Sequence, residues 1–358
     1  MSKLIALVMA GGRGTRFWPE STSLRPKQYL NLLGGSASLL EKTLERFEGL
    51  VPAENRYVIT VREQQDLAAL CSKGKISKKG IILEPAGRNT APCILLSLAQ
   101  LIANGAKEAD VVAIVPSDHV IINENGFREV IAQASEKART ERSIVTIGIS
   151  PHFPHTGFGY IHRGTSVGED CYRVSRFVEK PNYQTAVSYL QTGEYLWNAG
   201  MFVATIGTLL GEFKNYAAEM YLHYGDLVSA SGNDAKTAEI YQQLPKISID
   251  YAIMEKSQAV LTMPSRFDWN DLGSWDALES VIVKEEDNYI AADRGHYFEE
   301  AKDNIVFAPN QFVALINVQD LIVVSNKQSL LILPKKDAQR VKNAVDFLKD
   351  HPRGDELL

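Results

Sequence analysis

The stretch that decides the fold is residues 4–16, Leu-Ile-Ala-Leu-Val-Met-Ala-Gly-Gly-Arg-Gly-Thr-Arg, with the later Arg-Pro-Lys-Gln of residues 25–28. The unbroken apolar run predicts a buried parallel strand, because a strand covered on both faces loses the polar alternation. The glycines let backbone N–H groups approach an anion, and Arg13, Arg16 and Lys27 add positive charge to the same loop. A strand that delivers a cationic glycine loop indicates a polyphosphate-binding site.

Two familiar phosphate loops do not fit this stretch. A dinucleotide fingerprint counted from Gly12 gives Gly14 and then Phe17 where a third glycine is required, and this stretch has no Gly-Lys pair for a P-loop. A glycine-rich turn that merely links a strand to a helix is the plain alternative. Such a turn does not require several cations close together, so phosphate binding is favoured.

Ala-Gly-Gly-x-Gly-Thr-Arg followed by Pro-Lys-Gln resembles the opening signature of sugar-1-phosphate nucleotidyltransferases, and Phe17-Trp18-Pro19 resembles that of their mannose-1-phosphate guanylyltransferase branch. The resemblance implies that GTP and mannose 1-phosphate give GDP-mannose and pyrophosphate with Mg²⁺ as cofactor. Arg16 and Lys27 are then the expected catalytic residues, because they neutralise phosphate charge. The nucleotide-binding residues expected in the loop are Ala10, Gly11, Gly12, Gly14 and Thr15.

Composition and charge narrow the class of protein. The chain has 358 residues and a formal net charge of −5, which argues against a general nucleic-acid surface. Its three cysteines lie in no metal-binding or disulfide spacing, which is typical of a reducing compartment. The apolar stretch 93–103 is too short to span a membrane, and the N-terminal run lacks a convincing cleavage site. We therefore expect a cytoplasmic protein without membrane or nucleic-acid partners.

Strand and helix patterns alternate along residues 4–290, which predicts an α/β fold: a Rossmann-like, mostly parallel sheet with helices on both faces, as in GT-A-like nucleotidyltransferases. From residue 304 onward four short apolar runs recur between polar turns, which predicts a small stacked, β-helix-like unit followed by a terminal helix that Asp337 caps. We expect a catalytic domain at 1–290 and a C-terminal unit at 291–358. The latter is interpreted as a scaffold or dimer contact without chemistry, and a homodimer is expected.

A rigid polar loop, Glu-Pro-Ala-Gly-Arg-Asn-Thr-Ala-Pro at residues 84–92, follows the third predicted strand. It falls at the carboxyl end of a parallel sheet, where ligands bind in such folds. A cap for the following helix is the alternative, and both roles are compatible. The family resemblance suggests base and ribose contacts here. The nucleotide-binding residues expected in this loop are Glu84, Pro85, Arg88, Asn89 and Thr90.

Two aspartates are predicted metal ligands. Asp118 follows the apolar strand at 111–115, so its carboxylate reaches the cleft of the glycine loop, and Mg²⁺ prefers such oxygen ligands beside phosphates. Asp271, in the tryptophan-rich segment 267–275, is the second, and the family resemblance points to the same aspartate. Capping of a helix from Ser274 is the alternative role for Asp271.

The predicted sugar site is spread over three later segments. Gly159 belongs to a Gly-Phe-Gly-Tyr-Ile stretch that borders the sugar in the resembled family, and a strand glycine marks a bulge or a close approach. Glu179 is assigned to sugar hydroxyls and Lys180 to the sugar phosphate, although neighbours on a strand point to opposite faces unless the chain bends. A surface ion pair is the alternative. Asn198 offers a donor and an acceptor to a sugar hydroxyl, and Asp250 is as well explained by helix capping or the helix dipole as by catalysis.

Two other functions stay open at this stage. One alternative is that the substrate is a different sugar 1-phosphate. The other is that the chain is a non-catalytic regulatory subunit that senses GDP-sugars. A sensor is free to lose Lys27, Asp118 or Lys180, and all three are present, which favours the enzyme.

Overall fold

The computed structural model describes residues 2–12, 14–77, 79–168, 170–282 and 284–358. Contacts within the chain divide it into two compact units. Unit 1 comprises residues 1–11, 44–116 and 121–269, and unit 2 comprises residues 12–43, 117–120 and 270–358. Each unit is made of several separate segments of the chain. The expected domain boundary after residue 290 is therefore not tested by this division and stays a prediction.

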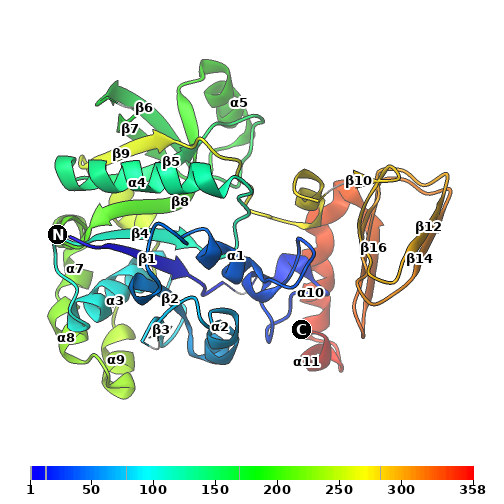
Figure 1. The fold of residues 1–358 in the computed structure, drawn as a ribbon, viewed down its shortest axis with the longest axis horizontal. Helices are drawn as coiled ribbons and strands as arrows, with labels where there is room; N and C mark the ends of the chain where they lie inside the picture. The colour runs from blue at the N-terminus through cyan, green and yellow to red at the C-terminus, as the bar shows by residue number, and fades with distance from the viewer. Residues whose placement is uncertain (1, 13, 78, 169, 283) are drawn as a thin grey trace. The chain divides into compact units, whose positions relative to one another are not determined.

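Unit 1 is built on a nine-stranded sheet in the order β3-β2-β1-β4-β8-β5-β9-β7-β6 (Figure 1). Its strands are β1 (Leu4–Met9), β2 (Arg56–Val61), β3 (Ile81–Glu84), β4 (Val111–Pro116), β5 (Ile144–Ile149), β6 (Tyr160–Ser166), β7 (Tyr172–Val178), β8 (Tyr195–Thr205) and β9 (Val260–Pro264). The predicted apolar strand β1 lies between β2 and β4 and is parallel to both. The α/β fold class is confirmed.

The sheet is parallel across β3, β2, β1 and β4 and between β5 and β9. The β4–β8, β5–β8, β6–β7, β6–β8 and β7–β9 pairs are antiparallel. Of the nine strand pairings that the described residues form in this sheet, five are antiparallel, so the expectation of a mostly parallel sheet is wrong. β6 and β7 are joined by a short connection that returns the chain directly beside itself, which enforces an antiparallel pair.

Helices cover both faces of this sheet. On one face α4 (Glu124–Glu141) packs over β4, β5 and β8 (Figure 1). The apolar residues of α3 (Thr90–Ala103) and α6 (Ile206–Tyr216) belong to the main buried cluster together with strand residues. The remaining helical segments of unit 1 are α2 (Gln65–Cys71), α5 (Tyr183–Thr192), α7 (Ala218–Tyr221), α8 (Tyr224–Ser229), α9 (Asp234–Tyr241), two short 3-10 turns (Ala53–Asn55 and Arg62–Gln64) and a π-helix (Asp250–Met254).

Unit 2 holds the glycine loop, two 3-10 turns (Thr15–Phe17 and Lys27–Tyr29) and the C-terminal strands. These strands are β10 (Lys284–Glu285), β11 (Asn288–Ala291), β12 (His296–Glu299), β13 (Ile305–Phe307), β14 (Val313–Ile316), β15 (Leu321–Ser325) and β16 (Leu330–Pro334). β11, β13 and β15 pair in parallel in one sheet, and β12 pairs in parallel with β14 in another. Alternate strands thus stack in register, which confirms the predicted β-helix-like unit.

Asparagine side chains link successive turns of this stack. Asn304 Nδ2 donates to Asn288 Oδ1 at 2.8 Å, and Leu321 N donates to Asn304 Oδ1 at 3.0 Å. Both asparagines are fully buried, so each must satisfy its amide internally. The ladder does that and fixes the register of the turns.

Two helix predictions need correction. The segment after Ser274 is a 3-10 helix (Trp275–Ser280) rather than an α-helix. Asp337 lies inside a second 3-10 helix (Lys335–Arg340), and α10 (Val341–Lys349) begins only after it. At the other end of the chain, Ser38 caps α1 (Leu39–Glu45) by accepting from Glu41 N at 3.2 Å. Helix α11 (Gly354–Leu357) ends the chain.

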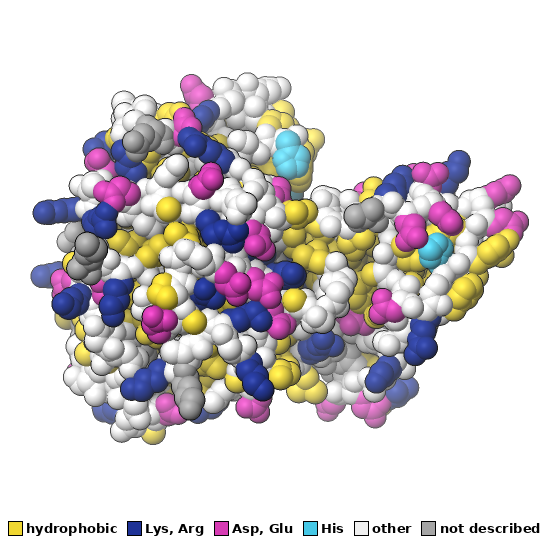
Figure 2. Space-filling view, in the orientation of Figure 1, with side chains coloured by type: hydrophobic (Ala, Val, Ile, Leu, Met, Phe, Trp, Pro, Cys, Tyr) yellow, Lys and Arg dark blue, Asp and Glu magenta, His cyan; other side chains and the backbone are white. Residues whose placement is uncertain are grey.

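No helix in the described ranges is long and apolar enough to cross a membrane. Figure 2 shows Lys and Arg side chains interspersed with Asp and Glu on the face that it displays. That face therefore carries mixed charge rather than one basic field.

Candidate functional site

A pocket of about 350 Å³ in unit 2 gathers the predicted cations and carboxylates. Its lining includes Gly14, Thr15, Arg16, Phe17, Lys27, Asp118, His119, Asp271, Leu272 and Gly273. Three distant stretches of sequence thus meet at one place. Thr15 and Arg16 are exposed, whereas Lys27 is only 5% exposed, so an exposed cation and a buried one line the same pocket.

Lys27 is held by two acceptors in this pocket. Its Nζ donates to Asp118 Oδ2 at 2.9 Å and to the backbone oxygen of Asp271 at 2.6 Å. The ammonium also lies 5.7 Å from the centre of the Phe17 ring, within the range of a cation–π contact. A buried lysine with defined partners is pre-organised to meet an anion without first reordering its long side chain.

Gly14 is required by the local geometry. Its φ of +49° lies in the left-handed region, and a Cβ built on it would lie 2.7 Å from Lys27 Cβ. Gln28 Nε2 donates to Gly12 O at 3.0 Å and thereby fixes the preceding turn. Ala10 is anchored to unit 1 through Thr60, whose hydroxyl donates to Ala10 O at 2.9 Å. Arg13 lies outside the described residues.

Burial on its own would raise the pKa of Asp118, but the charge of Lys27, the neighbouring His119 and the Lys27 hydrogen bond together lower it. A carboxyl whose pKa is lower in the folded than in the unfolded state stabilises the fold at pH values above its unfolded-state pKa. That stability is lost as the pH falls through its folded-state pKa. The Lys27–Asp118 ion pair is therefore intact at neutral pH and breaks only in acid below the ordinary value of 3.8.

The donor set of the pocket fits Mg²⁺. Asp118 and Asp271 supply carboxylates, and Mg²⁺ in phosphate-transfer sites is commonly held by one or two carboxylates plus phosphate oxygens. Among the described residues, in this pocket or outside it, no group of three or more His, Cys, Asp and Glu is placed to hold a metal ion. Asp271 caps no helix, because the following 3-10 helix has Ser274 at its N-cap.

The C-terminal part of unit 2 holds the cationic loop in place. The Trp18 indole donates to Leu357 O at 2.9 Å, and Asn326 Nδ2 donates to Pro19 O at 2.8 Å. The Trp275 ring packs against Phe17 with centroids 4.9 Å apart. The C-terminal strands and helices are therefore more than a scaffold remote from the chemistry, because they fix the loop that carries Arg16 and Lys27.

In unit 1 the predicted nucleoside loop begins at the end of β3. Asn89 is the N-cap of α3, and its side chain accepts from Thr90 N at 2.9 Å, so the capping role is confirmed. Asn89 has φ +70°, and such strained backbone in a non-glycine residue clusters at ligand sites. Arg88 Nη1 donates to Leu244 O at 2.7 Å, so one N–H donor of its guanidinium is engaged by the protein backbone.

Glu84 is a buried acceptor beside the glycine loop. Its Oε1 accepts from the Tyr241 hydroxyl at 2.6 Å and from Arg88 N at 3.1 Å. Its Oε2 lies 3.4 Å from the position that a Cβ on Gly11 would occupy. Burial raises the pKa of Glu84, and the two hydrogen bonds lower it by less. The sequence analysis did not identify Tyr241, because it lies 157 residues after Glu84 and no local pattern indicates their hydrogen bond.

The chain bends directly after β7, which resolves the question of whether Glu179 and Lys180 share a face. Lys180 has φ +49°, and its Nζ lies 2.9 Å from Glu179 Oε1. The hydrogen bond with Glu179 is the largest cause that raises the pKa of Lys180. The Glu179 side chain is 12% exposed and that of Lys180 is 61% exposed, so an ion pair is present and both groups face one region.

Gly159 lies against this ion pair. A Cβ on Gly159 would lie 2.5 Å from Glu179 Oε2 and 3.3 Å from Asn198 Cβ. Asn198 N also donates to Gly159 O at 2.8 Å. The close approach that the strand glycine predicted is therefore an approach to two of the predicted sugar residues.

We expect Gly159→Ala to raise the KM for the sugar substrate about tenfold or more, because the added methyl group displaces the Glu179 carboxylate. Steady-state kinetics with each substrate varied in turn measure this. Gly211→Ala is the control, since its Cβ meets nothing within 4 Å. An unchanged sugar KM in correctly folded Gly159→Ala protein would contradict the placement of Glu179.

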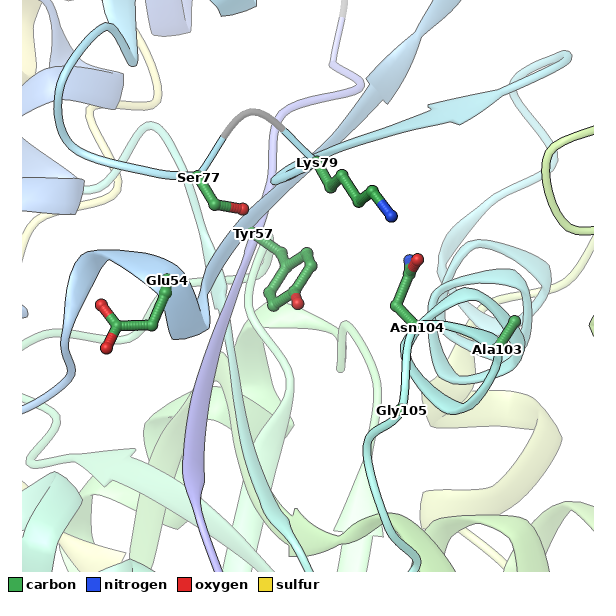
Figure 3. A pocket seen from close by; sticks show the side chains of 7 residues that line it. All are labelled: Glu54, Tyr57, Ser77, Lys79, Ala103, Asn104 and Gly105. Carbon is green, nitrogen blue, oxygen red and sulfur yellow. The ribbon is translucent and has the colours of Figure 1, made fainter.

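A second hollow, of about 640 Å³, lies in unit 1 near the amino ends of β2 and β3 (Figure 3). Figure 3 shows Lys79 directed toward Asn104 and Glu54 pointing away from both. Its charged groups do not converge on one point. The hollow therefore lacks the concentration of charge that marks the pocket around Lys27.

The comparisons with known proteins agree with this geometry. The family model described as nucleotidyl transferase matches residues 5–288, and a second, described as MannoseP isomerase/GMP-like beta-helix domain, matches residues 299–348. The chain is 36% identical over 357 residues to a protein of Vibrio cholerae named putative mannose-1-phosphate guanylyltransferase, covering 98% of this chain and 76% of that protein. It is 37% identical to a mannose-1-phosphate guanylyltransferase of Escherichia coli, covering 98% and 75%.

A solved structure supports the same relationship. The crystal structure described as mannose-1-phosphate geranyltransferase from Thermus thermophilus superposes with a TM-score of 0.88 at 35% identity, covering 97% of this chain and 99% of that one. The match extends over both the sheet and the C-terminal strands. The chain therefore belongs to the nucleotidyl transferase family, among its mannose-1-phosphate guanylyltransferases.

Proposed function

We propose that this enzyme transfers GMP from GTP to α-D-mannose 1-phosphate and forms GDP-mannose and pyrophosphate. The observation that carries the proposal is the buried Lys27 ammonium, fixed between Asp118 and Asp271 in a pocket that Arg16 also lines. Fixed positive charge in a shielded pocket is what a transferring phosphoryl group requires.

Arg16 and Lys27 take the phosphate chain in this proposal, together with the backbone N–H groups of Gly11, Gly12, Gly14 and Thr15. Bound Mg²⁺, held by Asp118 and Asp271, supplies further neutralisation of charge on the α-phosphate and the pyrophosphate. The protein orients the attacking sugar phosphate in line with the leaving pyrophosphate. A phosphate monoester has a second pKa near 6, so the nucleophile is ionised at neutral pH and needs no general base.

Glu84 supports guanine as the base. A carboxylate accepts hydrogen bonds only, and the guanine edge presents N–H donors where adenine presents an acceptor. Two of the acceptor positions of Glu84 are used by Tyr241 and Arg88, and Oε2 faces Gly11. Pro85, Asn89 and Thr90 complete the proposed nucleoside contacts, while Glu179, Lys180, Gly159 and Asn198 are assigned to the sugar phosphate.

The test is pyrophosphate release with Mg²⁺ from GTP and mannose 1-phosphate, with ATP, UTP and glucose 1-phosphate as alternative substrates. Release confined to GTP with mannose 1-phosphate is the expected result. Release with another sugar 1-phosphate would change the substrate but not the reaction. No release with any pair, in protein that binds GDP-mannose, would favour a regulatory subunit.

We also propose a cytoplasmic homodimer formed through the C-terminal strands. β16 pairs only with β15 among the described strands, so one edge of its backbone is left for another strand. Leu330 and Ile332 on β16 are 59% and 57% exposed. An exposed apolar edge strand is suited to pairing with a second copy of the chain. The location follows from the sequence, whose few cysteines fit a reducing compartment.

We expect Ile332→Lys to convert the dimer into a monomer, because the new charge lies on the proposed contact strand. Sedimentation equilibrium at several protein concentrations measures the mass. Leu222→Lys, which replaces an apolar side chain that is 80% exposed in unit 1, should leave the dimer intact. A dimer that survives Ile332→Lys would exclude this strand as the interface.

A further inference from the structure

Asp250 begins a π-helix whose i to i+5 geometry is shown by the 3.0 Å bond from Glu255 N to Asp250 O. π turns are rare and occur mostly at functional sites. The turn is anchored to the nucleoside loop, because Ile249 N donates to the Thr90 hydroxyl at 2.8 Å. The N-cap residue Ile249 makes no side-chain cap, and Tyr251 N donates to the Ser248 hydroxyl at 3.4 Å, so the side chain that caps this end is that of Ser248.

Asp250 instead contacts a predicted sugar residue. Asn198 Nδ2 donates to Asp250 Oδ1 at 3.0 Å, while Asn198 Oδ1 accepts from Gly200 N at 3.0 Å and from the Thr146 hydroxyl at 3.5 Å. The carboxylate accepts only, so the amide can be oriented in one way. The Asn198 oxygen is thus already engaged inside the protein, closely by Gly200 N and at longer range by the Thr146 hydroxyl. Its capacity to accept from a ligand is reduced, whereas the second N–H of its amide is not used in the bond to Asp250.

A sugar hydroxyl that donates in this region therefore requires another acceptor. Glu179, which lies beside Gly159, is one candidate, and Asp250, which is hydrogen-bonded to the Asn198 amide, is another. Burial and then the charge of Glu179 raise the pKa of Asp250 to about 6, against the lowering effects of a backbone hydrogen bond, the Asn198 amide and Lys180. Holding two carboxylates near each other in a partly buried site opposes folding. An amide at position 250 would fill the same space without that cost, so stability does not account for the aspartate.

We propose that Asp250 is a sugar-specificity residue, which fixes the orientation of the Asn198 amide and accepts a hydrogen bond from a ring hydroxyl of the sugar 1-phosphate. This assignment rests on the proposed function, since it names a further contact of the same substrate. The missing hydroxyl acceptor at Asn198 is what Asp250 supplies.

The first test is Asp250→Asn, which keeps the volume of the side chain and removes its charge. We expect the KM for the sugar 1-phosphate to rise about tenfold to a hundredfold, with the KM for GTP unchanged. Asp226→Asn is the matched control, because Asp226 is an exposed aspartate in helix α8 of the same unit. A parallel change in both KM values, or no change in the sugar KM, would overturn the proposal.

The second test uses mannose 1-phosphates that lack one ring hydroxyl. With the wild-type enzyme, removal of the hydroxyl that Asp250 binds should raise KM, and in Asp250→Asn the same removal should have little further effect. A merely structural role for Asp250 predicts equal penalties in both proteins for every analogue. Thermal unfolding confirms that the variant is folded, and Asp250→Glu provides a variant that retains the charge.

The pH profile gives an independent readout. Glu179 and Lys180 from the end of β7, Asn198 from β8, and Tyr251 and Glu255 from the same helix are the polar groups around Asp250. Below pH 6 Asp250 becomes protonated and loses acceptor capacity, so the sugar KM should rise. The substrate phosphate titrates near the same pH, and it does so equally with both proteins. The difference between wild type and Asp250→Asn therefore isolates Asp250, and identical profiles would contradict the proposal.

The two hypotheses fail in different ways. If wild-type protein does not use mannose 1-phosphate but uses another sugar 1-phosphate, the proposed substrate is wrong, and Asp250→Asn is then measured with that sugar. If wild-type protein is active and the variant shows an unchanged sugar KM, only the role of Asp250 is wrong.

Discussion

Lys27→Met is expected to lower kcat by about 10²-fold to 10³-fold while the protein stays folded. Methionine keeps an apolar chain over the Phe17 ring but removes the ammonium that Asp118 and Asp271 hold. The loss should appear in kcat rather than in the KM for GTP, because a fixed charge stabilises the transition state most where phosphate charge shifts. Initial rates at saturating substrates measure it.

Lys335→Met is the matched control for this result. Lys335 belongs to the same unit, its side chain is 15% exposed, and it forms an ion pair with Glu279. Its loss should lower the unfolding temperature without reducing kcat by more than about twofold. Lys27→Arg keeps the charge but not the compact ammonium, so partial activity is expected. Near-normal turnover by Lys27→Met would eliminate Lys27 as a catalytic residue.

Asp118→Asn is expected to lower activity at a fixed low Mg²⁺ concentration by about 10²-fold or more, because an amide is a weaker Mg²⁺ ligand than a carboxylate. Higher Mg²⁺ should recover part of the activity. Asp271→Asn should behave similarly, since Asp271 lines the same pocket. Mg²⁺ titrations of the rate are complemented by calorimetric titration of Mg²⁺ into protein saturated with GDP-mannose, which does not depend on turnover.

The control for the aspartates is Asp337→Asn. Asp337 is also a partly exposed carboxylate of unit 2, with an Arg340 ion pair at 3.4 Å. Asp337 is not among the residues that line the Lys27 pocket. Its substitution should change neither the Mg²⁺ dependence nor kcat. Unchanged Mg²⁺ affinity in both Asp118→Asn and Asp271→Asn would contradict their assignment as metal ligands.

Some features of this protein follow from the sequence alone. The apolar run of β1 and the cations around Gly14 indicate a strand that leads into a phosphate loop, because short-range apolar pattern and backbone freedom determine such elements. The same reasoning locates Asp118 at the end of β4, where the carboxyl edge of a parallel sheet places its side chain. The four apolar runs after residue 304 likewise indicate stacked strands.

Other features depend on contacts between residues far apart in the chain. The antiparallel half of the sheet, the hold of the C-terminal residues on Trp18, and the hydrogen bond of Tyr241 to Glu84 all belong to this group. So do the bend at Lys180, which brings Glu179 and Lys180 to one face, and the orientation of the Asn198 amide by Asp250. Sequence patterns record local periodicity, whereas a buried carboxylate acquires its role from the donors that the fold brings to it. The contact between Asp250 and the Asn198 amide, from which we propose a binding role for Asp250, is therefore visible only in the tertiary structure.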